Sequence, residues 1–382
     1  MSAPMTVSEE LARLALGDVA IDPALQAVAR WAVTEALVAV RDARGSWPKT
    51  AAAVLVGGTG VGAASPPQLA FLVGCLVAQR ATPWGGGRPV DLAAVVVPAA
   101  LAAAAVTETA GEREVVDAVA LGMEATARVA LGLGLSFYRR GWDLTCIAGR
   151  IGGAIAAGRV LGCDVVALQH AVGIAATEAA GLRRAARGEL GSVQVAKAGW
   201  DALEAALLGR RGFTAAAASL EGRRGLGQLA GDGFATGVAL QGLGERWVAL
   251  EHLAFAWMGR DAPGFQAGLA AGAHGGETVE ICRAPEPAAP ARLGEEALSW
   301  SVSCGLHDAG HVEHVASGEL VTVRSDESVT PGALVLVGVG PRQHFSPQLD
   351  PSALAAALPE SGAAAGEASV WQALESLRAS YA

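Results

Sequence analysis

Apolar residues along the first 244 positions fall into runs of helical length, separated by glycine, proline or charged residues. Apolar runs of this length are typical of amphipathic or buried helices. Asp22-Pro23 and Pro66-Pro67 are helix-start signals, because proline suits the first helical turn. The predicted helices cover residues 6–17, 22–43, 66–79, 92–109, 112–133, 145–161, 164–180, 194–209 and 212–220, with loops at 80–91 and 181–193. We therefore expect an all-helical domain over residues 1–244.

The pattern changes near Gly244, where short runs rich in β-branched residues begin. Such runs, bounded by turn residues, predict strands. The expected strands are Trp247–Leu250, Glu277–Ile281, Glu319–Arg324 and Ala333–Val339, with helices at about 261–273 and 294–306 between them. We expect a smaller α+β domain over residues 245–350. Helices within 351–382 are expected to return to the helical domain.

The stretch from Ala51 to Ala78 is uncharged and long enough to suggest a membrane span. Gly57–Gly62 and Ser65-Pro66-Pro67 interrupt it, and hydrocarbon does not tolerate lipid-exposed turns. We interpret it as two buried helices joined by a loop. The glycine cluster lacks the Lys-Ser/Thr ending of a nucleotide-binding loop, so it predicts only a turn.

Composition narrows the class of protein. The net charge of −9 argues against nucleic-acid binding, which requires clustered basic residues. With 50 glycines, abundant alanine and 5% aromatic residues, we expect helices to approach closely over small side chains. Five cysteines without a CxxC pair indicate neither a zinc knuckle nor a disulfide framework. Charges at Glu9, Glu10 and Arg13 do not suit a signal peptide, so we expect a cytoplasmic protein without membrane contact.

Three segments carry a family resemblance. They are Gly141–Thr145 with the small-residue helix after it, Lys197–Gly199, and Arg88–Asp91. Together with the helix-pair pattern of residues 158–181, they resemble the MmgE/PrpD family, which includes 2-methylcitrate dehydratase and cis-aconitate decarboxylase. The resemblance implies a large helical domain and a smaller α+β domain.

The resemblance also implies a chemistry. Family members are mostly lyases that remove a proton beside a carboxylate of a small polycarboxylate and then expel water or carbon dioxide, without a metal or other cofactor. Basic side chains bind the carboxylates and histidines move protons. Members generally form dimers, so we expect a homodimer, with a heteromeric partner subunit as the alternative.

Several family residues are replaced in this chain. Asp143 stands in place of the histidine of Gly-Phe-His-Pro-Thr, and Arg88 in place of the histidine of His-Pro-Ser-Asp. Ala81–Trp84 replaces an acidic stretch, and Phe255–Gly259 lacks the family lysine. Lys197 remains. The replacements argue against methylcitrate or aconitate as the substrate.

Asp143 and Lys197 are the main catalytic candidates. Asp143 lies at a helix start, where it can act as a base or simply cap the helix. Lys197 is expected to bind a carboxylate, sulfate or phosphate. The alternative is a solvated lysine on the helix surface without a binding role.

Substrate binding is assigned to Arg88, Asp91, Thr145 and Arg140. Arg88 can hold an anion in a bidentate manner, although a weak surface ion pair is the alternative. Arg140 can widen an anion site or be solvated. Tyr138 is a candidate acid, with a core-edge aromatic as the competing interpretation.

His307, His311 and His314 have the spacing that places three imidazoles on one helix face, as in a metal site. Gly310 weakens such a helix, and we predict a polar segment without a metal. His307 is kept as a catalytic candidate in a cleft between the domains.

We therefore predict a divergent lyase of bacterial specialised metabolism, such as antibiotic biosynthesis. It eliminates water, phosphate or sulfate from a small anionic substrate to give an alkene or a small ring. One alternative is an isomerase or epimerase with a second proton-transfer group near Asp143, such as His307 or Tyr138. Another is an inactive member that binds a ligand or supports a partner subunit.

Overall fold

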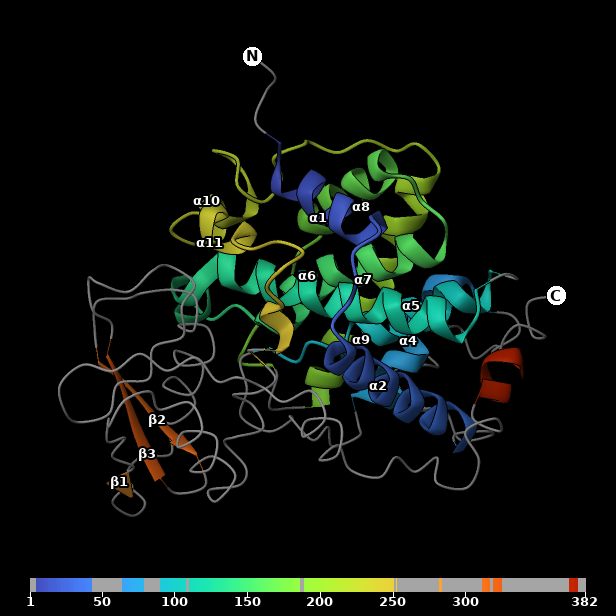
Figure 1. Cartoon of the computed structure of the whole chain (residues 1–382), viewed down its shortest axis with the longest axis horizontal. Coiled ribbons are helices and arrows are strands. Elements are labelled where there is room, and N and C mark those ends of the chain that lie inside the picture. The colour runs from blue at the N-terminus through green and yellow to red at the C-terminus, as the bar shows by residue number, and fades with distance from the viewer. Residues whose placement is uncertain are drawn as a thin grey trace.

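The computed structural model describes residues 5–42, 64–78, 90–107, 110–185, 189–250, 252, 282–283, 311–316, 319–324 and 371–376. Figure 1 shows a bundle of helices that surrounds a central pair, α6 and α7. The helices are α1 (Val7–Leu16), α2 (Pro23–Asp42), α4 (Pro66–Val77), α5 (Val96–Ala105), α6 (Glu112–Arg139), α7 (Leu144–Val160), α8 (Val165–Thr177), α9 (Glu189–Arg210), α10 (Leu226–Ala230) and α11 (Thr236–Leu240). The prediction that residues 1–244 are all-helical is confirmed for the described residues of that range.

Helix α7 lies at the centre of the bundle and packs against α5, α6, α8 and α9. Nearly all of its residues are buried, as expected for a helix that is apolar on every side. Glycines allow the close approach: a Cβ added at Gly153 would lie 2.9 Å from the Cβ of Ala202 on α9. The expected dense packing over small side chains is therefore present, and it fixes the relation of α7 to α9.

Local capping explains several helix starts. The side chain of Thr6 accepts from the backbone N–H of Glu9, and Asp164 caps α8 in the same way through Ala167. Ser65 and Gln68 form a reciprocal capping box at the start of α4. These signals lie in the sequence itself, so the helix starts near them were predictable.

Three local predictions were wrong. Trp247–Leu250 is not a strand, because residues 248–250 are helical. Residues 212–220 form turns rather than a helix. Helix α9 begins at Glu189, inside the predicted 181–193 loop.

Three short strands are described: β1 (Cys282–Arg283), β2 (His311–Ala316) and β3 (Glu319–Arg324). They form an antiparallel sheet in the order β1-β3-β2, with Val312 opposite Val323. The predicted strand Glu319–Arg324 is confirmed. The predicted strands Glu277–Ile281 and Ala333–Val339, the helices at about 261–273 and 294–306, and His307 lie outside the described residues. An α+β domain over 245–350 stays a prediction.

The metal interpretation of the histidine segment depended on a helix. His311 and His314 lie in strand β2, so the helical spacing argument does not apply to them.

Residues 371–376 are helical, and Ala373 and Leu374 are buried in the same hydrophobic cluster as α1 and α2. No helix in the described part of the chain is long and apolar enough to cross a membrane. Of the two helices expected within Ala51–Ala78, α4 is present, and the first falls outside the described residues.

Candidate active site

A polar seam runs between the buried faces of α7 and α9. It comprises Asp143, Arg150, Gln194, Lys197 and Asp201, and we call it the α7–α9 seam. Two hydrogen-bonded contacts cross it: Asp143 with Gln194, and Arg150 with Asp201. The second contact lies seven residues after the first on both helices. Residues seven apart share a helix face, so the two helices run side by side in the same direction here.

Asp143 is buried and uses its two oxygens differently. Oδ1 accepts from the backbone N–H of Cys146 (3.2 Å), which caps α7, and Oδ2 accepts from Nε2 of Gln194 (2.7 Å). The helix-cap interpretation of Asp143 is therefore present in the structure. Burial raises the pKa of the Asp143 carboxyl, opposed by backbone hydrogen bonds and by the charge of Arg183. A raised pKa moves this carboxyl toward the range in which a general base can work.

Gln194 also holds the α8–α9 connection onto Asp143. Its Nε2 donates to the carbonyl of Leu182 (3.3 Å), and its Oε1 accepts from the Leu182 backbone N–H (3.2 Å). The backbone N–H of Asp143 donates to the carbonyl of Gly181 (3.1 Å). Residue Asp143 is thus held by three segments at once.

Lys197 lies one turn beyond Gln194 and shares Asp201 with Arg150. Its ammonium pairs with Oδ1 of Asp201 and lies 5.3 Å from the ring centre of Trp200. Arg150, which is buried, donates from Nε (3.2 Å) and Nη2 (3.0 Å) to Oδ2 of Asp201. The Lys197 side chain is 46% exposed. It is the cation of the seam that solvent or a ligand can reach.

Glu178, at the end of α8, faces this group of charges. Burial raises the pKa of its carboxyl, and the nearby charges of Asp201 and Glu204 raise it further. Its Oε2 is buried without a hydrogen-bond partner in the described part of the chain. The region around Lys197 therefore holds a carboxyl whose charged form is disfavoured.

Asp91 and Thr145 meet beside the start of α7. The backbone N–H of Asp91 donates to Oγ1 of Thr145 (2.9 Å). The Asp91 carboxylate accepts from the backbone N–H groups of Ala93 and Ala94 (3.0 and 3.1 Å), so it orders its own turn. The structure thus brings two of the predicted substrate-binding residues together, and one of them, Thr145, lies two residues after Asp143 in the chain.

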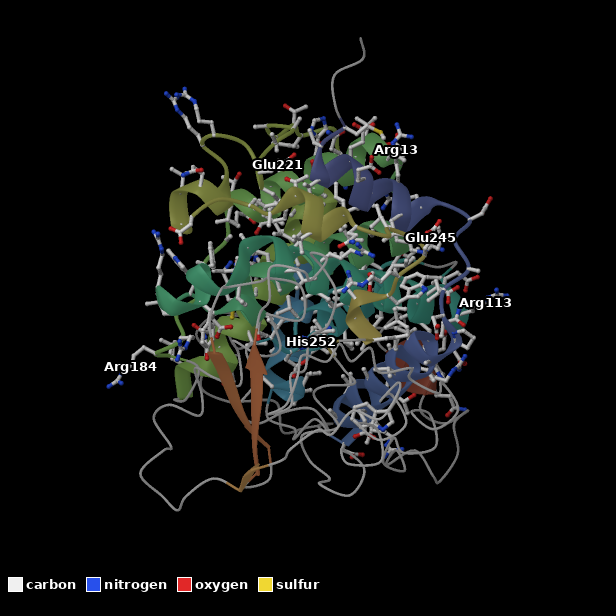
Figure 2. The ribbon with its side chains drawn as sticks, turned by 60° about the vertical axis from the view of Figure 1, so that its left-hand side comes forward. Arg13, Arg113, Arg184, Glu221, Glu245 and His252 are labelled. Carbon is white, nitrogen blue, oxygen red and sulfur yellow. The ribbon has the colours of Figure 1, made fainter. Side chains whose placement is uncertain are left out.

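His252 is a buried residue that the sequence analysis missed. Its Nε2 lies 3.0 Å from the carbonyl oxygen of Val90, the residue before Asp91. Figure 2 shows His252 within the body of the molecule, whereas Arg184 projects from its edge. A carbonyl only accepts hydrogen bonds, so Nε2 of His252 is the donor in this contact. No motif in the sequence marked this histidine.

The remaining predicted residues make other contacts or lie outside the described residues. Tyr138 is buried, and the guanidinium of Arg183 stacks 3.7 Å above its ring centre, which favours the core-edge interpretation. Arg140 is exposed and pairs with Asp232. Arg88 and His307 are outside the described residues. Within the described ranges, no group of three histidine, cysteine or acidic side chains is arranged to hold a metal ion.

Similarity to a known family covers most of this site. The MmgE/PrpD N-terminal domain matches residues 21–239, more than half of the chain, and the protein belongs to this family. The match includes Asp143 and Lys197, and the predicted resemblance is confirmed. His252 lies beyond the matched residues.

Two curated sequences of cis-aconitate decarboxylase are similar to this chain, both from Aspergillus terreus and one of them from strain NIH 2624 / FGSC A1156. Each is 32% identical over 126 residues. The aligned segment covers 32% of this chain and 25% of each relative's length.

Proposed function

We propose that this protein is a lyase that binds a small carboxylic acid at the exposed end of the α7–α9 seam and eliminates a leaving group from it. The observation that carries the proposal is the pairing of a reachable cation, Lys197, with a buried carboxyl of raised pKa, Asp143. They are linked through Gln194, one turn from Lys197 and hydrogen-bonded to Asp143. The family's two named activities, dehydration and decarboxylation, also begin from small carboxylic acids.

Arg150 allows Lys197 to leave Asp201 and bind a substrate. When the ammonium of Lys197 turns toward a substrate carboxylate, Asp201 keeps two hydrogen bonds from Arg150. The buried Asp201 carboxylate is then still paired, so releasing Lys197 does not leave an isolated buried charge. This arrangement supports a binding role for Lys197.

Asp143 is the proposed base. Its Oδ2, oriented by Gln194, takes the proton from the carbon beside the substrate carboxylate. The electron pair of that C–H bond forms the C=C bond, and phosphate or sulfate departs with the electron pair of its C–O bond. A departing hydroxyl group also takes back the proton from Asp143 and leaves as water. Cations near the departing group stabilise the negative charge that develops on it.

An isomerase or epimerase remains the second candidate, and His252 is the observation that favours it. Such a reaction requires one group to remove a proton and another to return one. Tyr138 lies under Arg183 and does not suit this role. His252 contacts the Val90–Asp91 turn, which is joined to Thr145, two residues from Asp143.

The first test compares anion binding by the wild type and Lys197→Met. We expect citrate, cis-aconitate, phosphate or sulfate to raise the melting temperature of the wild type, because a ligand at a hundredfold excess over its Kd stabilises by about 2.7 kcal/mol. The stabilisation should disappear in Lys197→Met and persist in Arg210→Met, which removes an exposed cation from the last turn of the same helix. Equal stabilisation in all three proteins would place the anion elsewhere, and none in the wild type would favour an inactive scaffold.

The second test separates the two roles of Asp143. Serine is as good a helix cap as aspartate but carries no carboxylate. We expect Asp143→Ser to retain its melting temperature and anion stabilisation while losing conversion by at least about 100-fold, as is typical for a missing general base. Product formation is followed by NMR on the acid that stabilises the wild type most. Full turnover in Asp143→Ser would mean that Asp143 is only a helix cap and not the catalytic base.

A further inference from the structure

Helix α6 contains a charged pair that is fully buried. Glu124 and Arg128 are each 0% exposed, and Nε of Arg128 lies 2.6 Å from Oε1 of Glu124. Burial raises the pKa of the Glu124 carboxyl, whereas Arg128 and backbone N–H groups oppose that increase. Neither residue belongs to the α7–α9 seam, so the pair requires another explanation.

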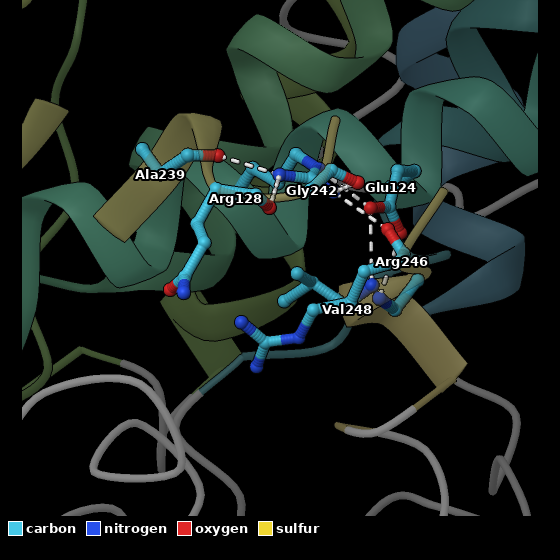
Figure 3. Close-up of polar contacts among 8 residues, drawn as sticks. Glu124, Arg128, Ala239, Gly242, Arg246 and Val248 are labelled. Carbon is cyan, nitrogen blue, oxygen red and sulfur yellow. Dashed lines mark hydrogen bonds and ion pairs between the residues drawn. The ribbon is translucent and has the colours of Figure 1, made fainter. Parts of the chain in front are cut away.

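The partners of this pair all lie in one segment, residues 239–249 (Figure 3). Arg128 donates to the carbonyls of Ala239 (2.8 Å), Gln241 (3.1 Å), Gly242 (3.3 Å) and Arg246 (2.6 Å). The carboxylate of Glu124 accepts from the backbone N–H groups of Val248 (3.0 Å) and Ala249 (2.8 Å). The pair therefore attaches this segment to α6 through the main chain.

The two N–H groups bound by Glu124 lie at the start of a helix. Val248 and Ala249 begin the helical residues 248–250, and His252 is helical as well. The first N–H groups of a helix have no partner within it, and a carboxylate there is also favoured by the helix dipole. Glu124 thus caps, from a different helix, the segment that carries His252.

We propose that Glu124 is a positioning residue for His252 in the active site. His252 lies three positions after Ala249, less than one helical turn, so the location of the cap fixes the direction of the imidazole. Held this way, Nε2 of His252 donates to the carbonyl of Val90. The catalytic importance of His252 rests on the proposed function, but its placement by Glu124 does not.

The test is an NMR measurement on the full-length chain, labelled with nitrogen-15. In the wild type we expect a resonance from the Nε2–H of His252 that exchanges slowly with water, and His252→Asn identifies it by its loss among the 7 histidines. In Glu124→Gln, which keeps the shape and removes the charge, this resonance should disappear. Val248→Pro should have the same effect without altering the charged pair, since it removes one N–H at a helix start, where proline is tolerated.

Asp164→Ala is the matched control, because it removes a carboxylate cap from α8, away from His252. Its spectrum should retain the His252 resonance. An unchanged resonance in Val248→Pro, or in a folded Glu124→Gln, would overturn the proposal. Loss of the resonance in Asp164→Ala as well would also overturn it, since general destabilisation would then explain the effect. The NMR result is independent of anion binding at Lys197, so failure of the proposed function is seen separately.

Discussion

Arg128→Met is expected to lower the free energy of unfolding by about 3–5 kcal/mol, the usual cost of removing one partner from a buried ion pair. Arg128 is fully buried with Glu124, and its guanidinium also serves four backbone carbonyls. Methionine fills a similar volume but leaves a buried carboxylate and those carbonyls without this donor. Denaturation by urea, followed by circular dichroism, measures the difference.

Arg13→Met is the matched control for this experiment. Arg13 forms an ion pair with Glu9 at the same four-residue spacing, but its side chain is 55% exposed. Exposed pairs of this kind contribute little, so we expect a change within about 0.5 kcal/mol. A similarly small change for Arg128→Met would mean that segment 239–249 is held by other contacts.

The helices were predictable where their signals are local. The range 145–161 was predicted for α7 (Leu144–Val160), and the carboxylate of Asp143 caps it as the sequence suggested. The starts at Pro23 and Pro66 also follow from residues at those positions. Each of these signals involves a few consecutive residues, which makes them visible without knowledge of the tertiary structure.

The wrong predictions have tertiary causes. The run 212–220 is rich in alanine, yet two of its backbone groups bind distant side chains. His170 accepts from the N–H of Ala215 (3.2 Å), and Ser8 donates to the carbonyl of Ala217 (2.7 Å). Likewise, Trp247–Leu250 has the composition of a strand, but Glu124 binds two of its N–H groups and starts a helix there.

Only part of the candidate site was foreseeable. Asp143, Lys197, Asp91 and Thr145 were selected by likeness to a family, and the last two do meet. Gln194, Arg150 and Asp201 were not selected, because their importance depends on which helices pack together. The spacing of seven residues is present in both helices, but nothing local indicates that these two faces meet.

The closeness of α6 and α7 leads to the second large expected effect, in Gly152→Ala. Alanine normally stabilises a helix interior relative to glycine by about 0.5–1 kcal/mol. Here a Cβ would lie 2.0 Å from Oγ1 of Thr126 and 2.3 Å from the carbonyl oxygen of Gly122. Both atoms are on α6, and the backbone carbonyl can move only with its helix. We therefore expect a net loss of about 1–3 kcal/mol, as is typical of overpacking.

Gly237→Ala is the control, because a Cβ on this α11 glycine meets nothing within 4 Å. Urea denaturation should show a gain of about 0.5–1 kcal/mol for Gly237→Ala and a loss for Gly152→Ala. A gain in both would mean that the two helices separate easily. Because α7 carries Asp143 and Arg150, displacing it from α6 also shifts both cross-contacts of the α7–α9 seam. Gly152→Ala should consequently weaken anion stabilisation at Lys197, although Gly152 itself lies on the opposite side of α7, against α6.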